Sequence, residues 1–261
     1  MTRARPNRSG FEQRLLGTLR GMGGLSGSRL TIGFSGGRDS LALAAALSRI
    51  TPVLKAELLL VHVDHRLRSS SAEDATACAG LASKLGLSIE VVALDYGLDD
   101  RRSGTGLEEA ARRERYLALA EAAAGWGSTT LLLGHQANDQ AETVLMHLFR
   151  GSGLDGIGGM REQEVRQIPW WSNAAPRSIE VKIVRPLLAE TRDTIERYVA
   201  EIGLQPIEDE SNASDDFDRN WVRHQVLPPI LERWPSAVET IQRSASAINF
   251  DRRFLEKAAD E

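Results

Sequence analysis

Short apolar runs alternate with amphipathic stretches through the first 150 residues of the chain. The apolar runs are typical of strands that are buried on both faces of a sheet, and they lie at 30–34, 57–63, 89–94 and 129–133. The stretches between them repeat apolar residues at helical spacing, at 41–50, 71–85, 106–124 and from 139 to just before Gly151. This order of strands and helices predicts an α/β fold with a doubly wound, mostly parallel sheet.

Beyond Gly151 the alternation ends. A glycine-rich loop, "GSGLDGIGGM", precedes a stretch without a clear period, "VRQIPWWSNAAP". A strand at 179–184 and a helix at 192–202 follow, and then an acidic stretch, "IEDESNASDDFD", that has the composition of a linker. Helices are expected from Arg219 onward, with breaks at Pro228-Pro229 and Pro235. We therefore expect three segments: an N-terminal helical or flexible segment (1–28), the α/β domain (29–205), and a linker with a helical extension (206–261).

Composition narrows the class of protein. The chain has 261 residues, 42% of them hydrophobic, which suffices for one sizeable core and a smaller appendage. Its single cysteine, Cys78, excludes a disulfide framework and a cysteine-based zinc cluster, and its place on a predicted helix favours a buried, unreactive side chain. No apolar run approaches the roughly 20 residues that a membrane helix needs, and the basic start has no apolar signal region, so we expect a cytoplasmic protein without a membrane partner.

The charged residues leave two interpretations open. A net charge of −4 argues against indiscriminate nucleic-acid binding. All but four of the 32 cationic residues are arginine, which suits bidentate contacts with phosphate and therefore an RNA-facing surface. An arginine-rich coding bias explains the same count, so composition alone does not decide between them.

The stretch "FSGGRDS" (34–40) lies between a predicted strand and a predicted helix. Glycine lets the backbone approach an anion closely, and the N–H groups that open a helix point toward it, so this turn is a candidate phosphate cradle. It lacks the lysine of a Walker A loop and differs from the G-x-G-x-x-G fingerprint; an ordinary glycine turn before a helix is the alternative. The turn resembles the SGGxDS loop of the PP-loop ATP pyrophosphatases, which cleave ATP between the α and β phosphates and adenylate a carbonyl oxygen. That resemblance implies that Asp39 binds Mg²⁺ and that Ser35, Gly36, Gly37 and Ser40 hold the pyrophosphate portion of ATP. It also assigns Arg38 to the ATP site.

Three further motifs follow. In "VHVDHRLR" (61–68) the alternation of a strand places His62 and Asp64 on one face and His65 on the other, which argues against a shared zinc ion. In "LEEAARRERY" (107–116) the spacing of Glu108 and Arg112 allows an ion pair, and a solvated helix face is the alternative.

The last motif is "LGHQANDQAETVLMHLFRG" (133–151). It puts His135 at a strand end and Asp139 and Glu142 in the first turn of a helix. There the two carboxylates either complement the helix dipole or meet Mg²⁺ or an incoming amine.

Taken in this order and spacing, the four motifs resemble those of the tRNA(Ile)-lysidine synthases. The resemblance covers about residues 30 to 230 and continues through "RPLL" (185–188) and a DxSN then RNxxR pattern within 209–223. Glu210 departs from the pattern, since the family commonly has proline there. Longer members carry further C-terminal domains, so this chain is either a short member or a piece of a longer one.

The resemblance implies an adenine-nucleotide α-hydrolase-like fold and a two-step reaction. ATP would adenylate O2 of the first anticodon cytidine of tRNA(Ile) with a CAU anticodon, and the ε-amine of free L-lysine would then displace AMP at C2 to give lysidine. Asp139 with Glu142 would bind lysine, Arg112 and His135 would contact the ATP phosphates or the adenylate, and a homodimer is left open. The remaining assignments are Asp64 and Gly134 for ATP, and Asn212, Arg219 and Arg223 for tRNA.

Three other classes share the first turn. A PP-loop thiolase generally depends on paired cysteines or an iron–sulfur cluster, which one cysteine cannot supply. An amidating ligase of the GMP or NAD synthetase kind should not need the 209–223 module. A nucleotide sensor without turnover is opposed by the presence of both Asp39 and Asp139.

Overall fold

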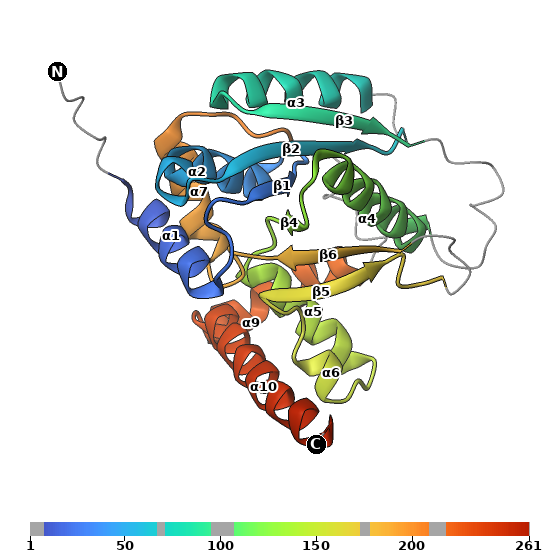
Figure 1. Cartoon of the computed structure of the whole chain (residues 1–261). Coiled ribbons are helices and arrows are strands. Elements are labelled where there is room, and N and C mark those ends of the chain that lie inside the picture. The colour runs from blue at the N-terminus through green and yellow to red at the C-terminus, as the bar shows by residue number, and fades with distance from the viewer. Residues whose placement is uncertain (1–7, 67–70, 95–106, 173–177, 209–217, 261) are drawn as a thin grey trace. The chain divides into compact units, whose positions relative to one another are not determined.

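The computed structural model describes residues 8–66, 71–94, 107–172, 178–208 and 218–260 of the chain. A six-stranded sheet in the order β3-β2-β1-β4-β6-β5 organises it (Figure 1). The strands are β1 (Arg29–Gly33), β2 (Glu57–Asp64), β3 (Ser88–Ala93), β4 (Thr130–Leu132), β5 (Gln163–Ile168) and β6 (Ile179–Val184). The first four strands and β6 pair in parallel, which confirms the predicted doubly wound, mostly parallel sheet.

β5 was not predicted from the sequence. It pairs antiparallel with β6 at the edge of the sheet, and most of its residues are exposed or half-buried. An edge strand exposes much of its length to water and therefore lacks the continuous apolar run of an interior strand. Val165 is 63% exposed, whereas Ile168 is fully buried, so the apolar signal is reduced to one inward residue.

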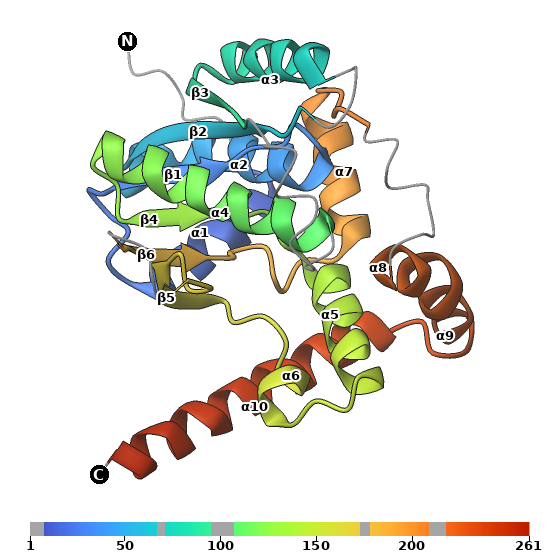
Figure 2. The same cartoon turned by 90° about the vertical axis from the view of Figure 1, so that its right-hand side faces the viewer.

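Helices cover both faces of the sheet (Figures 1 and 2). They are α1 (Gly10–Met22), α2 (Arg38–Leu54), α3 (Ser71–Leu85), α4 (Leu107–Trp126) and α7 (Arg192–Ile202). Figure 2 shows α4 across one face, while α2 and α3 lie on the other. One apolar core lies between α4 and the sheet, where Tyr116 and Leu119 pack against Leu131 and Ile183.

The remaining helices form a separate hydrophobic cluster. They are α5 (Ala137–Phe149), α6 (Leu154–Ile157), α8 (Asp218–Trp221), the π-helical segment η3 (Val222–Val226), α9 (Leu227–Arg233) and α10 (Ala237–Asp260). Ala141 and Leu145 of α5 pack with Val222, Leu227 and Val238, and α10 runs beside α5 and α6 (Figure 2). The expected break at Pro228-Pro229 is shifted, because these prolines occupy the first turn of α9, where a missing N–H costs nothing.

The chain divides into two compact units. Unit 1 comprises 1–134, 163–186 and 198–207, and unit 2 comprises 135–162, 187–197 and 208–261. The bounds of these units differ from the segment boundaries expected at 28/29 and 205/206. Those two boundaries stay predictions. No helix in the described part of the chain combines the length and the apolarity that crossing a membrane requires.

Candidate functional site

The candidate phosphate loop lies in unit 1, between the end of β1 and the start of α2. Gly37 is the N-cap residue of α2, with extended backbone angles (φ −66°, ψ 165°), and no side chain caps this end of the helix. The N-terminus of this 17-residue helix therefore carries its partial positive charge without a side-chain cap. Such an end suits an anionic ligand.

Two glycines of the loop region are tightly surrounded by other atoms. Gly36 has φ +76°, and a Cβ atom there would lie 2.4 Å from Cδ1 of Ile207 and 2.8 Å from Sγ of Cys78. A Cβ atom on Gly134, which follows β4, would lie 3.1 Å from the carbonyl carbon of Asp39. The backbone of Gly134 therefore closely approaches the first turn of α2.

The hydroxyl groups of two serines make hydrogen bonds inside the phosphate loop. The Oγ atoms of Ser35 and Ser40 lie 3.1 Å apart, and Ser40 Oγ donates to the carbonyl of Gly37 at 3.0 Å. The N–H of Gly37 in turn donates to Ser35 Oγ at 3.3 Å. Ser35 is exposed and Ser40 is buried, so the two serines hold the turn from its outer and its inner side.

His62 supports the loop, a role that sequence reasoning missed. Its Nδ1 lies 2.9 Å from the carbonyl oxygen of Phe34 and 3.3 Å from Sγ of Cys78. Burial is the larger cause, and the nearby carboxylate of Asp74 the smaller one, of the rise in the pKa of the Cys78 thiol to about 12. Cys78 is therefore the buried, unreactive cysteine that was predicted. The described residues contain no group of three or more His, Cys, Asp or Glu side chains that could hold a metal.

Two further predicted ATP ligands also lie in unit 1. Asp64 ends β2, and its Oδ1 accepts the N–H of Arg66 at 2.9 Å, so the carboxylate is held at the carboxyl edge of the sheet. Arg112 is exposed on α4, with its guanidinium 5.6 Å from the ring centre of Tyr116. The predicted pairing of Arg112 with Glu108 involves a side chain outside the described set.

In unit 2, α5 begins two residues earlier than predicted because Gln136 is its N-cap. The side chain of Gln136 accepts the N–H of Asn138 at 2.7 Å, and the Gln136 N–H donates to Oδ2 of Asp139 at 3.0 Å. Asp139 therefore completes a capping box and adds negative charge at the helix N-terminus. One of its two carboxylate oxygens is committed to the helix itself.

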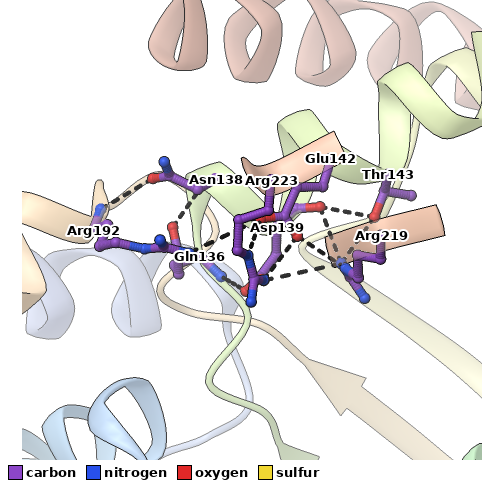
Figure 3. A network of polar contacts seen from close by, with 8 residues as sticks. All are labelled: Gln136, Asn138, Asp139, Glu142, Thr143, Arg192, Arg219 and Arg223. Carbon is purple, nitrogen blue, oxygen red and sulfur yellow. Dashed lines mark hydrogen bonds and ion pairs between the residues drawn. The ribbon is translucent and has the colours of Figure 1, made fainter. Parts of the chain in front are cut away.

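Glu142 lies one turn further along α5 and is fully buried (Figure 3). Arg219 donates to it through Nε at 2.9 Å, and Arg223 donates through Nε at 2.7 Å and Nη2 at 2.9 Å. Nη2 of Arg192 is more distant, at 3.9 Å. A buried carboxylate is stable only when it is paired and hydrogen-bonded, and these contacts satisfy both oxygens.

The same two arginines reach Asp139. Arg223 Nη2 lies 3.4 Å and Arg219 Nη2 3.9 Å from Oδ1 of Asp139. Burial raises the pKa of Asp139, the Arg219 guanidinium opposes that rise, and the Glu142 carboxylate adds to it. A raised pKa makes the carboxylate of Asp139 a stronger proton acceptor than an ordinary aspartate.

The predicted site residues thus fall into two groups, one in each compact unit. Unit 1 holds the loop with Asp64, Arg112 and Gly134, and unit 2 holds His135, Asp139, Glu142, Arg219 and Arg223. Asn212, which was predicted to contact tRNA, lies outside the described residues. The expected contact of Arg219 and Arg223 with RNA stays a prediction, although the structure gives both arginines protein partners.

Arg223→Ala is expected to lower the free energy of unfolding by about 3 kcal/mol, because it removes one of the two guanidinium groups that directly hydrogen-bond the buried carboxylate of Glu142. Urea denaturation measures this loss. Arg150→Ala is a matched control: it breaks an exposed pair with Asp218 and should cost at most about 1 kcal/mol. Unchanged stability, with a tRNA-binding salt dependence that is flatter by about one counterion, would instead indicate an RNA contact.

Comparison with known proteins places this geometry in a family. Residues 9–230 match the PP-loop domain family. The tRNA(Ile)-lysidine synthase of Symbiobacterium thermophilum is 39% identical over 237 residues, which is 90% of this chain and 46% of that protein. The tRNA(Ile)-lysidine synthase of Salinispora tropica is 40% identical over 227 residues, 86% of this chain and 63% of that protein. The chain thus spans about half to under two thirds of the length of these relatives.

A solved structure shows the same fold. The U34-tRNA thiolase of Methanococcus maripaludis superposes with a TM-score of 0.72 at 18% identity, covering 91% of this chain and 77% of that one. An identity this low supports the shared fold and nothing finer. Together with the match over residues 9–230, the loop at 34–40 and the sheet order show that the chain belongs to the PP-loop domain family.

Proposed function

We propose that this protein is an ATP-dependent ligase that forms lysidine in tRNA(Ile). ATP adenylates O2 of the cytidine at the first anticodon position, and the ε-amine of free L-lysine then displaces AMP at C2. The observation that carries the proposal is the loop around Gly36 at the N-terminus of α2, which accepts no side chain and suits a phosphate group. The family match and the names of the relatives support the same chemistry.

In this proposal, residues of unit 1 bind ATP and carry out the adenylation step. Ser35, Gly36 and Gly37 bind the pyrophosphate portion, while the N-terminus of α2 stabilises the negative charge that grows on it. Asp39 lies in the first turn of α2 and offers one carboxylate. This fits Mg²⁺, which takes one or two carboxylates together with water and phosphate oxygens, and which would neutralise charge on the phosphates when bound.

In the second step, Asp139 acts as the base for the amine of lysine. The amine of free lysine has a solution pKa near 10.4 and is mostly protonated at neutral pH, so it needs a base before it can attack. Asp139 is a half-buried carboxylate with a raised pKa, and its Oδ1 accepts one long hydrogen bond from Nη2 of Arg223 at 3.4 Å, with Nη2 of Arg219 at 3.9 Å. The target cytosine must also leave its stack, which is easiest in a single-stranded anticodon loop.

A thiolase is the second candidate because of the fold it shares with the archaeal enzyme. Sulfur transfer on a cluster needs several cysteine ligands. The only cysteine of this chain is Cys78, which is fully buried behind the loop. Ligation of an amine is therefore the better-supported reaction.

The mass of intact tRNA tests the proposal. A tRNA(Ile) transcript with a CAU anticodon, incubated with protein, ATP and lysine, is expected to gain the mass of one lysine less one water. A transcript with uridine at the first anticodon position is the matched control and should keep its mass. An unchanged mass for the cytidine transcript, with ATP and lysine present, would refute lysidine formation by this chain.

A further inference from the structure

Ile207 contacts the phosphate loop at its most constrained point. Its N–H donates to the carbonyl of Gly36 at 3.0 Å, and its Cδ1 lies 2.4 Å from the position that a Cβ atom on Gly36 would take. The residue is half-buried and belongs to the same compact unit as the loop. It is also the first residue of the acidic stretch that has the composition of a linker, so its sequence context gives no sign of this contact.

Two residues from other elements also contact the loop. Sγ of Cys78 lies 2.8 Å from the same Cβ position on Gly36, and Nδ1 of His62 lies 2.9 Å from the carbonyl oxygen of Phe34. The space beside Gly36 is thus filled by the side chain of Ile207 and by the side chain of Cys78 from α3. Because these residues are far apart in sequence, the enclosure exists only in the folded protein.

A glycine at φ +76° needs such support. Glycine populates many backbone conformations when nothing restrains it, and fixing one residue in a single conformation has a substantial entropic cost. A loop that is already ordered binds its ligand more tightly than one that must become ordered on binding. The contacts of Ile207 therefore bear directly on the affinity for a phosphate ligand.

We propose that Ile207, together with His62 and Cys78, forms a clamp that holds the loop in the conformation that binds the pyrophosphate portion of ATP. Ile207 is a positioning residue, because it acts through its contacts with Gly36. The identity of the nucleotide rests on the proposed function. The ordering of the loop does not, and it can be measured in the absence of tRNA and lysine.

Ile207→Gly tests the clamp, with Ile207→Val as the conservative variant and the exposed Gln205→Gly as the control for backbone flexibility. Removing the side chain is expected to weaken binding of ATP with magnesium about tenfold, as measured by calorimetry, because the loop must then become ordered on binding. The Val variant should bind like the wild type, and so should the Gln205 variant. Where Ile207→Gly does not fold, Ile207→Ala takes its place.

Cys78 provides a second readout, since it is the only cysteine in the chain and is fully buried behind Gly36. Opening of the clamp should expose it, so labelling by a thiol reagent is expected to be several-fold faster in Ile207→Gly than in Ile207→Val or Gln205→Gly. Equal labelling rates and equal ATP affinities in the three variants would overturn the clamp. If the wild type bound no ATP, the proposed function would fail, and the labelling rates alone would decide the clamp.

Discussion

Asp39→Asn is expected to slow the adenylation of tRNA by about a thousandfold, while tRNA binding stays nearly unchanged. Asparagine keeps the shape of the side chain and removes its negative charge. Asp39 lies in the first turn of α2, next in sequence to Ser40 of the phosphate loop, and not on a surface expected to meet RNA. Its loss should therefore affect the nucleotide step alone, because phosphate and metal contacts, not RNA contacts, depend on that charge.

The measurement separates the two effects. Release of pyrophosphate in the presence of tRNA reports adenylation, and a filter-binding titration reports tRNA affinity. Asp193→Asn is the matched control, because Asp193 is an exposed aspartate in the first turn of α7 and undergoes the same chemical change. Full pyrophosphate release by Asp39→Asn would remove Asp39 from the reaction.

Where the sequence predicted the fold correctly, local pattern was sufficient. The interior strand β2 carries an uninterrupted apolar run at 58–61, and α7 was predicted with its observed bounds because its apolar residues repeat at helical spacing. The edge strand β5 has no such run. The start of α5 was placed two residues late because its N-cap is Gln136, whereas serine, threonine, aspartate and asparagine are the usual N-cap residues.

Some residues of the candidate site could likewise be predicted from the sequence, and others could not. The loop at 34–40 is a contiguous motif, so its glycines could be identified from their order alone. Ile207 and His62 could not, because an isoleucine carries no chemical signal and a histidine on a strand suggests a metal as readily as a hydrogen bond to Phe34. The contacts of Glu142 with Arg219 and Arg223 join residues about 80 positions apart, a distance at which spacing says nothing about contact.

The second prediction with a large expected effect concerns the order of the two reaction steps, which the release of pyrophosphate reports. Enzymes that activate an amino acid release pyrophosphate with amino acid and ATP alone, whereas here the RNA carbonyl is proposed to attack the α-phosphate before lysine enters. The loop around Gly36 can hold pyrophosphate in either scheme, so its geometry does not choose between them. With tRNA(Ile) and ATP but no lysine, we expect adenylated tRNA and pyrophosphate. With lysine and ATP but no tRNA, we expect essentially none.

Asp139→Asn should then slow the second step far more than the first. Removing a general base typically lowers a rate by about a hundredfold or more, and only the attack of lysine needs one. The change keeps the shape of the side chain but replaces the carboxylate whose pKa burial raises. Rapid-quench assays that start from ATP and from adenylated tRNA measure the two steps separately, with Asn138→Ala as a control next to Asp139 on α5. An equal loss in both steps would mean that Asp139 maintains the structure of α5. Lysine-dependent pyrophosphate exchange without tRNA would exclude the proposed order, even if lysidine were the final product.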